Sequence, residues 1–295
     1  MCGICGFTGY RQDQKTVIER MMKAIAHRGP DSEGSFCREK ITLGFRRLSI
    51  IDLEDGQQPM ESADGNLHIV FNGEIYDYKE LRAELETFGI SFCTHSDTEV
   101  LVNTLQQYGE KALDKLRGMF GFAVWNEKEQ TLMLARDFFG IKPVYYAEID
   151  GHFVFASEIK SILAFPGYER KVNQKALEQY LSFQYSPLEE TFFRGIYKLM
   201  PGHMLLYKNG SYEIKTYFKP KLTPGQWNHK TNMAQLRSQL SEILKDSVKH
   251  HMLSDVEVGA FLSGGVDSGY LASSTLDDAF LTNNSTLMDN EVMVN

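Results

Sequence analysis

The sequence predicts an α+β fold for most of the chain, followed by the beginning of a parallel α/β unit. Short stretches with strand-like alternation recur up to about residue 218, and helical periodicities fall between them. The composition changes over 219–230, where two prolines, a glycine and several polar residues are typical of a linker. Beyond it an apolar run leads directly into a glycine-rich turn, which is the pattern of a parallel strand buried on both faces.

Alternation of apolar and polar residues marks the expected strands of the first domain. Residues 2–10 alternate loosely around three glycines, and residues 67–72 indicate a half-buried strand that ends at Asn72-Gly73. Their spacing suggests that the next apolar stretches form an antiparallel meander joined by tight turns, one of them at Asp150-Gly151. These stretches are 118–126, 130–137, 143–149 and 152–157.

Three segments of the first domain have helical periodicity. In 14–27 the apolar residues recur every three or four positions, and Gly29-Pro30 ends the run. Residues 78–89 and 97–109 each end on a glycine, as helices often do. Asp97 would suit the N-cap of the helix that follows it.

The second domain is expected to begin with an amphipathic helix over 233–248. A buried strand over 256–262, a turn over 263–268 and a short helix are expected to follow. The tail 274–295 has acidic residues and no Lys or Arg, which favours irregular structure. The predicted organisation is therefore a first domain over 2–218, a linker over 219–230 and the start of a second domain over 231–295.

Composition excludes several classes of protein. The formal net charge is -8, which gives no electrostatic reason to bind nucleic acid or an anionic membrane. No apolar run is long enough for a membrane span, and the N-terminus has no signal-peptide pattern. Four cysteines in 295 residues do not make a disulfide scaffold. We expect a reduced, soluble, cytoplasmic globular protein.

The cysteine at position 2 is the first candidate for chemistry. If Met1 is removed, Cys2 carries a thiol and a free α-amine, whose reference pKa values are about 8.5 and about 8. The amine can then take the thiol proton and return it to a leaving group. Two other interpretations stay open. Cys2 and Cys5 form a C-x-x-C motif that would suit zinc or redox chemistry, or the spacing is a structural accident.

Eight short motifs occur in order along the chain: CGI at 2–4, HRGPDSEG at 27–34, RRLSIIDL at 46–53, FNGEIYD at 71–77, SDTE at 96–99, RDFFGIKPVYY at 136–146, FASEIKSIL at 155–163 and LSGGVDS at 262–268. Together they resemble class II glutamine amidotransferases, most closely the glutamine-hydrolysing asparagine synthetases. The resemblance extends to about residue 275. It implies a four-layer αββα N-terminal-nucleophile hydrolase domain, followed by the start of a doubly wound, ATP-pyrophosphatase-like domain.

The resemblance assigns roles in glutamine hydrolysis to residues of the first domain. Cys2 is the nucleophile, and the guanidinium of Arg47 binds the substrate α-carboxylate. Asn72 and Gly73 form an oxyanion hole. The substrate ammonium is assigned to Glu74 and Asp97, and the pocket wall to Leu48, Ser49, Ile50 and Ile51. Taken without the resemblance, Arg47 would be a solvated surface arginine and Asn72-Gly73 a plain turn.

The turn SGGVDS at 263–268 is the candidate site of the second domain. A glycine-rich turn before a helix presents backbone N–H groups to an anion, although this one lacks the Lys-Ser/Thr of a Walker motif and would otherwise be an ordinary turn. It resembles the pyrophosphate loop of ATP pyrophosphatases. The implied ATP-binding residues are Leu262, Ser263, Gly264, Gly265, Asp267 and Ser268. Asp267 would also hold Mg²⁺ if the domain were complete.

The resemblance implies a reaction in two parts. A thioester on Cys2 releases glutamate and ammonia from glutamine without a cofactor. In the second domain, ammonia reacts with an aspartyl-adenylate made from aspartate, ATP and Mg²⁺, which gives asparagine. We expect this chain to retain only the glutaminase half, and a homodimer is compatible with the resemblance. The alternatives are a related ligase that amidates another carboxylate, and a non-catalytic remnant of the fold.

Overall fold

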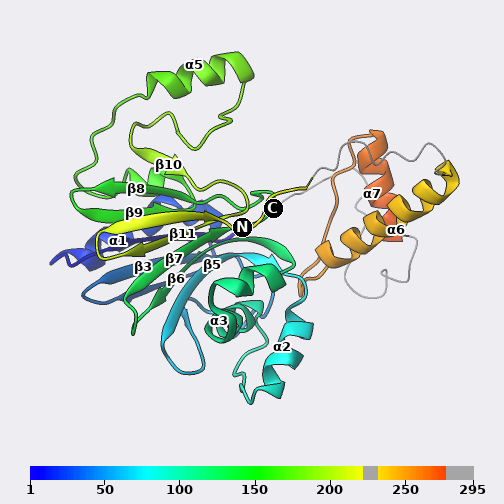
Figure 1. Cartoon of the computed structure of the whole chain (residues 1–295), viewed down its shortest axis with the longest axis horizontal. Coiled ribbons are helices and arrows are strands. Elements are labelled where there is room, and N and C mark those ends of the chain that lie inside the picture. The colour runs from blue at the N-terminus through cyan, green and yellow to red at the C-terminus, as the bar shows by residue number, and fades with distance from the viewer. Residues whose placement is uncertain (222–231, 277–295) are drawn as a thin grey trace. The chain divides into compact units, whose positions relative to one another are not determined.

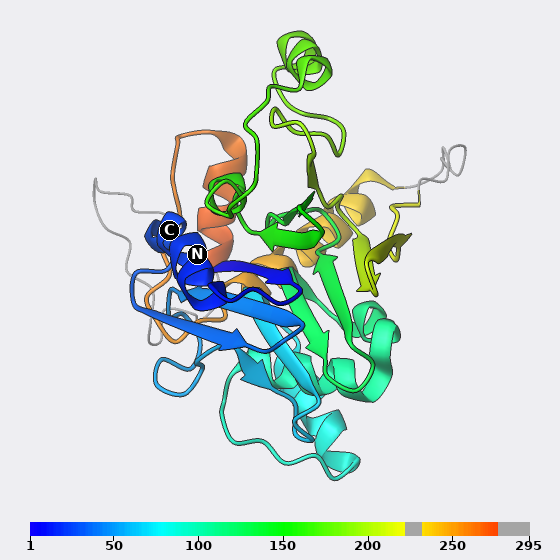
Figure 2. The ribbon, with the colours of Figure 1, turned by 90° about the vertical axis from the view of Figure 1, so that its left-hand side faces the viewer.

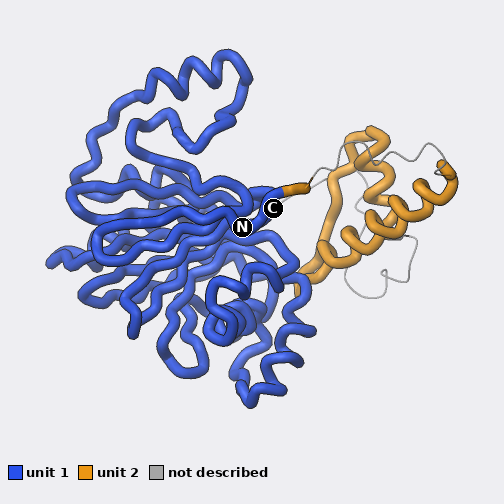
Figure 3. Tube along the Cα trace, viewed as in Figure 1, with its two compact units in different colours: residues 1–219 blue, residues 220–295 orange. Residues whose placement is uncertain are grey.

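The computed structural model describes residues 1–221 and 232–276, and the chain divides into two compact units. Unit 1 is Met1–Lys219 and unit 2 is Pro220–Asn295, drawn in different colours in Figure 3. Most of the expected linker, and the expected irregular tail from residue 277 onward, lie outside the described residues. No helix in the described part of the chain is long and apolar enough to cross a membrane.

Unit 1 is built on two antiparallel sheets, each with six strands among the described residues (Figures 1 and 2). The first sheet has the order β10-β8-β9-β1-β3-β2, and the second has the order β12-β11-β7-β6-β5-β4. The strands of the first sheet are β1 (Gly3–Thr8), β2 (Ser32–Cys37), β3 (Ile41–Arg47), β8 (Tyr145–Ile149), β9 (His152–Ala156) and β10 (Ile196–Lys198). The strands of the second sheet are β4 (Met60–Glu61), β5 (Leu67–Ile75), β6 (Gly118–Asn126), β7 (Thr131–Arg136), β11 (His203–Lys208) and β12 (Ser211–Thr216).

Helices cover the outer faces of both sheets, which gives unit 1 four layers. α1 (Gln14–Ala24) and α4 (Ile159–Ile162) pack on the first sheet, while α2 (Tyr78–Thr87) and α3 (Asp97–Tyr108) pack on the second. A further apolar core fills the space between the sheets. The four-layer αββα arrangement implied by the resemblance is therefore confirmed. The remaining helical elements of unit 1 are η1 (Ala26–Arg28), η2 (Gly109–Lys115) and α5 (Gln174–Phe183).

β1 is an interior strand of the first sheet. It pairs with β3 along one edge and with β9 along the other. Its side chains alternate between the two faces, so that Ile4 packs into the core between the sheets while Cys5 and Phe7 pack against α1. Because both edges of β1 are paired, the backbone at Cys2 that leads into it is held in place.

The expected single meander is wrong, because its strands are divided between the two sheets. β6 and β7 pair in the second sheet, whereas β8 and β9 pair in the first. Local alternation gives each strand but not the sheet to which it belongs, and here the chain crosses between sheets over 137–144. The tight turn at Asp150-Gly151 is confirmed, with φ of 49° and 80° at its two residues.

β5 does not end at Asn72-Gly73, as the sequence suggested, but continues to Ile75. β6 pairs with it along its whole length. A Cβ atom on Gly73 would lie 2.2 Å from the carbonyl oxygen of Met119, so glycine is needed where the two backbones approach. A dipeptide that often forms a turn is thus part of an extended strand.

Unit 2 contains α6 (Met233–His251) and α7 (Val266–Leu276) among its described residues, as the helical patterns predicted. The hydroxyls of Ser241 and Tyr270 lie 2.8 Å apart and join the two helices. The strand expected over 256–262 is wrong, because this stretch has no regular structure and its last residues are exposed. A strand needs a neighbour for its backbone N–H and C=O groups, and the described part of unit 2 offers none.

Candidate active site

A cavity of about 40 Å³ lies where the start of the chain meets β3, β5, the N-terminus of α3 and the loop before β8. It brings together all but one of the first-domain residues predicted for the glutamine site. Those that line it are Cys2, Arg47, Leu48, Ile50, Ile51, Asn72, Gly73, Glu74 and Asp97. Ser49 is the exception, because its backbone N–H donates to Asp31 at 2.8 Å and the residue is not part of the lining.

The Cys2 sulfur lies 3.4 Å from both the backbone nitrogen and the carbonyl oxygen of Leu48. Burial raises the pKa of the thiol, while the Leu48 N–H, the terminal amine and Lys142 act to lower it. Burial also lowers the pKa of the Met1 α-amine, which makes an amine at this position a better base near neutral pH. Met1 itself forms part of the cavity wall, so its removal would enlarge a space that now holds only a few water molecules.

Cys5 lies on the other side of the first sheet from Cys2. Cys2 packs against the core between the sheets, whereas Cys5 is fully buried in the core under α1. Burial raises the pKa of Cys5 to about 12, so this thiol is inert near neutral pH. The two sulfurs cannot share a zinc ion or form a redox pair. Within residues 1–221 and 232–276, no group of three or more His, Cys, Asp and Glu side chains is placed to hold a metal ion.

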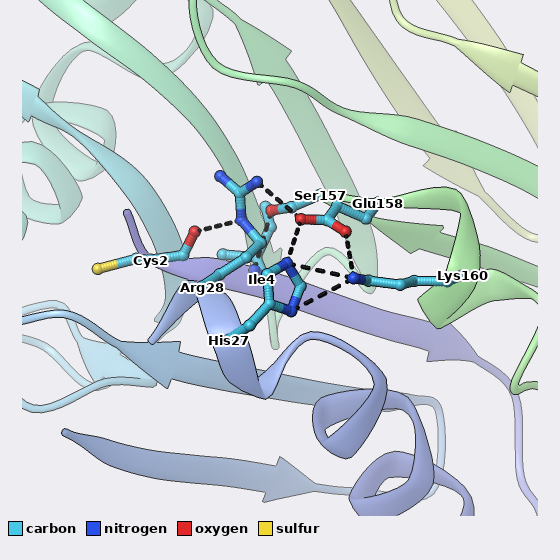
Figure 4. Close-up of polar contacts among 7 residues, drawn as sticks. All are labelled: Cys2, Ile4, His27, Arg28, Ser157, Glu158 and Lys160. Carbon is cyan, nitrogen blue, oxygen red and sulfur yellow. Dashed lines mark hydrogen bonds and ion pairs between the residues drawn. The ribbon is translucent and has the colours of Figure 1, made fainter. Parts of the chain in front are cut away.

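A polar cluster anchors the backbone of Cys2 from the outer side (Figure 4). Arg28 donates from Nε to the Cys2 carbonyl oxygen at 2.9 Å, and its Nη1 lies 3.0 Å from Glu158 Oε1. His27 and Lys160 also contact Glu158, at 2.9 and 3.0 Å. The sequence analysis gave no role to Arg28 or Glu158. Both lie inside motifs that carried the resemblance, which is the signal that would have drawn attention to them.

β1 is fixed a second time, two residues after Cys2. The Ile4 N–H donates to Ser157 Oγ at 3.0 Å, and the Ser157 N–H donates to the Ile4 carbonyl oxygen at 2.8 Å. Ser157 and Glu158 are neighbours in the chain directly after β9. The same short segment therefore fixes both the strand and the arginine that bonds to Cys2.

Arg47 is buried, which excludes the solvated surface arginine that its residue type alone would suggest. Its guanidinium donates to the carbonyl oxygens of Ile51, Asp52 and Leu53, so it holds the loop after β3 against the cavity. A Cβ on Gly56 would lie 2.5 Å from Arg47 Nη2, so the loop also closes tightly on the guanidinium. A buried cation thus forms one wall of the cavity.

The side-chain amide nitrogen of Asn72 is buried without a hydrogen-bond partner in the described structure. An unpaired donor of this kind is costly to bury, typically by about 1–3 kcal/mol. It lies beside Gly73 in the lining of the cavity that also contains the Cys2 sulfur. The Asn72 amide can therefore donate a hydrogen bond to an oxygen atom that enters the cavity, which is what an oxyanion hole requires.

Two carboxyl groups complete the cavity. Asp97 is the first residue of α3, and Ser96, not Asp97, caps the helix by accepting from the Thr98 N–H. This leaves Asp97 to accept from the Ile75 N–H at 3.0 Å and to face the cavity. Burial raises the pKa of Asp97 to about 7, and the charge of Glu74 adds to the rise. A cationic ligand would relieve this repulsion.

Residues 263–265 of the predicted turn precede α7, whereas residues 266–268 form the first turn of that helix. Gly264 adopts a φ of 78°, which favours glycine. The hydroxyls of Ser263 and Ser268 lie 3.0 Å apart, and the Gly265 N–H donates to Ser263 Oγ at 3.4 Å. Residues 263–267 are exposed, and Ser268 is half-buried. Hydroxyls and N–H groups at a helix N-terminus suit a phosphate, whereas Asp267 is the single carboxylate of the turn and by itself does not make a metal site.

The fold and the cavity define a class of protein. Two stacked antiparallel sheets between helices present a cysteine at the start of an interior strand, beside a free amide donor and two carboxylates. This is the architecture of an N-terminal-nucleophile hydrolase.

Comparison with known proteins gives the family. Residues 1–218 match the glutamine amidotransferase domain family, and residues 239–278 match the asparagine synthase family. The chain therefore belongs to the class II glutamine amidotransferases and carries a short start of an asparagine synthase domain. A solved structure of glutamine phosphoribosylpyrophosphate amidotransferase from B. subtilis shares the fold, with a TM-score of 0.57 and 17% identity, over 93% of this chain and 64% of that one.

Two curated relatives show how the chain compares in length. It is 45% identical to asparagine synthetase [glutamine-hydrolyzing] 1 of Bacillus subtilis, covering 92% of this chain and 43% of that protein. It is 35% identical to amidase chry2 of Gibberella zeae, covering 92% of this chain and 42% of that protein. The chain thus spans less than half the length of these relatives.

Proposed function

We propose that unit 1 hydrolyses the side-chain amide of glutamine with Cys2 as the nucleophile. The observation that carries the proposal is the unpartnered, buried Asn72 amide in the same small cavity as the Cys2 sulfur. Buried Arg47 supplies positive charge for a substrate carboxylate, and Asp97 and Glu74 supply negative charge for a substrate ammonium. A small amino acid with both groups, and an amide at the end of its side chain, complements this set.

The chemistry requires one proton to move at each step. The α-amine of Cys2, free after removal of Met1, takes the thiol proton while the sulfur attacks the amide carbon. The oxygen of the tetrahedral intermediate accepts hydrogen bonds from Asn72 Nδ2 and the Gly73 N–H. The amine returns the proton to the leaving nitrogen, which departs as ammonia and leaves a thioester. Water then attacks the thioester, which releases glutamate and restores the thiol.

The experiment that tests this function is an assay of glutamate release by the purified, processed chain. Cys2→Ala should abolish release, whereas Cys5→Ala should retain most of it, with folding checked by circular dichroism. Equal loss in two folded variants would favour a role for both cysteines. Absence of release from the wild-type chain would support the non-catalytic remnant.

For the longer protein of which this chain resembles the first part, we propose ammonia transfer to an acid activated by ATP. The support is the name of the Bacillus subtilis relative and the match of residues 239–278. The implied ATP site over Leu262–Ser268 offers hydroxyl and N–H donors to phosphate, and Mg²⁺ bound there would screen the phosphate charge.

The acceptor acid is proposed to be aspartate. The fungal relative is called an amidase. The alternative is therefore that the acceptor is a carboxylic acid other than aspartate. Pyrophosphate release should be assayed with ATP, Mg²⁺ and a panel of acids on a full-length relative and on this chain. We expect aspartate to be the best acid for the relative. We expect no aspartate-dependent release from the 295-residue chain, because no strand supports the phosphate turn in its described part.

A further inference from the structure

The largely buried side chain of Lys142 lines the Cys2 cavity, and the proposed function gives it no role. The residue is 5% exposed and lines the cavity together with Cys2, Asn72 and Glu74. Within residues 1–221 and 232–276, no hydrogen bond or ion pair reaches its Nζ. Burial lowers the pKa of Lys142, and the charges of Glu74 and Cys2 act to raise it, so a lysine at this position needs an explanation.

The backbone around Lys142 is clamped, which fixes where the side chain starts. Its N–H donates to Asp137 Oδ2 at 2.9 Å, and its carbonyl oxygen accepts from Arg136 Nε at 2.8 Å. Arg136 also donates to the carbonyl oxygens of Gly140 and Leu199, at 2.6 and 2.7 Å. These hydrogen bonds fix the segment 137–144, which connects the two sheets, in a conformation that places residue 142 at the cavity.

The charged groups around the Cys2 thiol come from every element that meets there. The positive ones are the terminal amine, Arg28 of η1, Arg47 at the end of β3, and Lys142. The negative ones are Glu74 of β5, Asp97 of α3, Asp137 beside Lys142, and Asp31, which acts on the terminal amine. Arg28 and Arg47 already donate to backbone carbonyls or a carboxylate. Lys142 is the side-chain cation in this group whose donors are free.

The geometry points to Lys142 as the cation that stabilises negative charge on the Cys2 sulfur, an inference that rests on the proposed glutamine hydrolysis. The thiol proton passes to the α-amine, and Lys142 keeps its own proton throughout. Its positive charge offsets burial and the charge of Asp97, both of which disfavour the thiolate. Because the backbone of Lys142 is held by hydrogen bonds, its ammonium group is already in position when the sulfur attacks.

The test is the pH dependence of Cys2 alkylation by iodoacetamide, followed by mass spectrometry of the N-terminal peptide. It compares the wild type with Lys142→Met, which keeps the length and removes the charge, and Lys142→Arg, which keeps the charge. We expect the midpoint to rise by about one pH unit in Lys142→Met, which makes alkylation below it about tenfold slower. Lys142→Arg should recover most of the difference, and Lys128→Met, at an exposed lysine that pairs with Asp64 away from the cavity, should change nothing.

Glutamate release, measured in parallel, should show a fall in kcat with little change in KM for Lys142→Met. Near-UV circular dichroism checks folding, and Lys142→Gln replaces the methionine variant if that variant does not fold. An unchanged alkylation midpoint in a folded variant would overturn the inference. A wild-type chain that alkylates normally yet releases no glutamate would overturn the proposed function, while the midpoints would still decide the role of Lys142.

Discussion

Arg28 donates a hydrogen bond from Nε to the carbonyl oxygen of Cys2 across 2.9 Å. Because the opposite end of the guanidinium is paired with Glu158, the position of the nucleophile depends on a carboxylate that does not touch the cavity. Ion pairs near the surface contribute little to stability in most proteins. Here the value of the pair lies in where it places Cys2.

Glu158→Gln should therefore lower kcat about tenfold with a small effect on KM, because small misplacements of a nucleophile slow the chemical step strongly. The melting temperature should change little. Glu129→Gln is a matched control, since Glu129 pairs with exposed Lys208. Equal kcat values in the two variants would show that the cluster in Figure 4 does not position Cys2.

The oxyanion role predicts a large kinetic effect at Asn72 with no loss of stability. Asn72→Ala should lower kcat about 100- to 1,000-fold, as loss of one such donor does elsewhere. Stability should be unchanged or higher, because the Nδ2 atom has no partner to lose. Steady-state kinetics and urea unfolding measure the two quantities.

Asn103 provides the contrast for this prediction. It is fully buried, but its side chain donates to the Glu99 carbonyl oxygen and accepts from the Ala63 N–H. Asn103→Ala should cost stability with kcat close to normal in the folded fraction. The opposite pattern in the two variants would refute the assignment of the oxyanion donor.

The raised pKa of Asp97 predicts that stability depends on pH. The ordinary carboxyl pKa of 3.8 becomes about 7 in the folded protein, so between these pH values the folded state binds a proton that the unfolded state has lost. The free energy of unfolding therefore falls as pH rises from about 4 to about 7, and this contribution is constant above that range. Asp97→Asn should remove it and stabilise the free protein at pH 8 by roughly 2–4 kcal/mol.

Urea unfolding at pH 5 and pH 8 would measure this effect. At pH 5 the difference between the wild type and Asp97→Asn should be clearly smaller than at pH 8, because pH 5 lies near the lower end of the range over which the wild type loses stability. The same variant should raise KM for glutamine, since the substrate ammonium loses a negative partner. A variant that is less stable than the wild type at pH 8 would contradict the prediction.

Processing of Met1 is the fourth prediction. We expect the intact mass of protein produced in cells to be lower by one methionine, because a Met1 that remains in place occupies the cavity wall and blocks the amine of Cys2. A Cys2→Leu variant should keep its methionine and be inactive. An active preparation in which Met1 is fully retained would rule out the terminal amine as the base.

Elements with strong local patterns could be predicted from the sequence. The helices over 78–87 and 97–108 follow from apolar periodicity and a terminal glycine, and β6 has the bounds that its alternation gave. The division of strands between two sheets could not be predicted, because it depends on the crossing at 137–144. The strand over 256–262 failed because a local apolar run does not supply a partner strand.

The candidate site shows the same limit. Cys2, Asn72 and Asp97 were named because their motifs resemble a family in which they have roles. Arg28, Lys142 and Glu158 lie in other motifs of the same set, and their importance follows only from contacts far along the chain, such as the one between residues 28 and 158. Asp97 alone suggested a helix cap, and the structure gives that task to its neighbour Ser96.

The interior position of β1 sets a time limit on the maturation of the enzyme. The strand that closes its second edge, β9, begins at His152, so the ribosome must add about 150 residues before β1 can be sealed. At about 5–20 residues per second, this leaves roughly 8–30 s before both edges of β1 can be paired. An aminopeptidase that acts within this interval meets a terminus that has not yet folded, whereas one that arrives later meets a Met1 that lines the folded cavity. The glutaminase activity of the protein should thus depend on the rate of translation relative to the rate at which Met1 is removed.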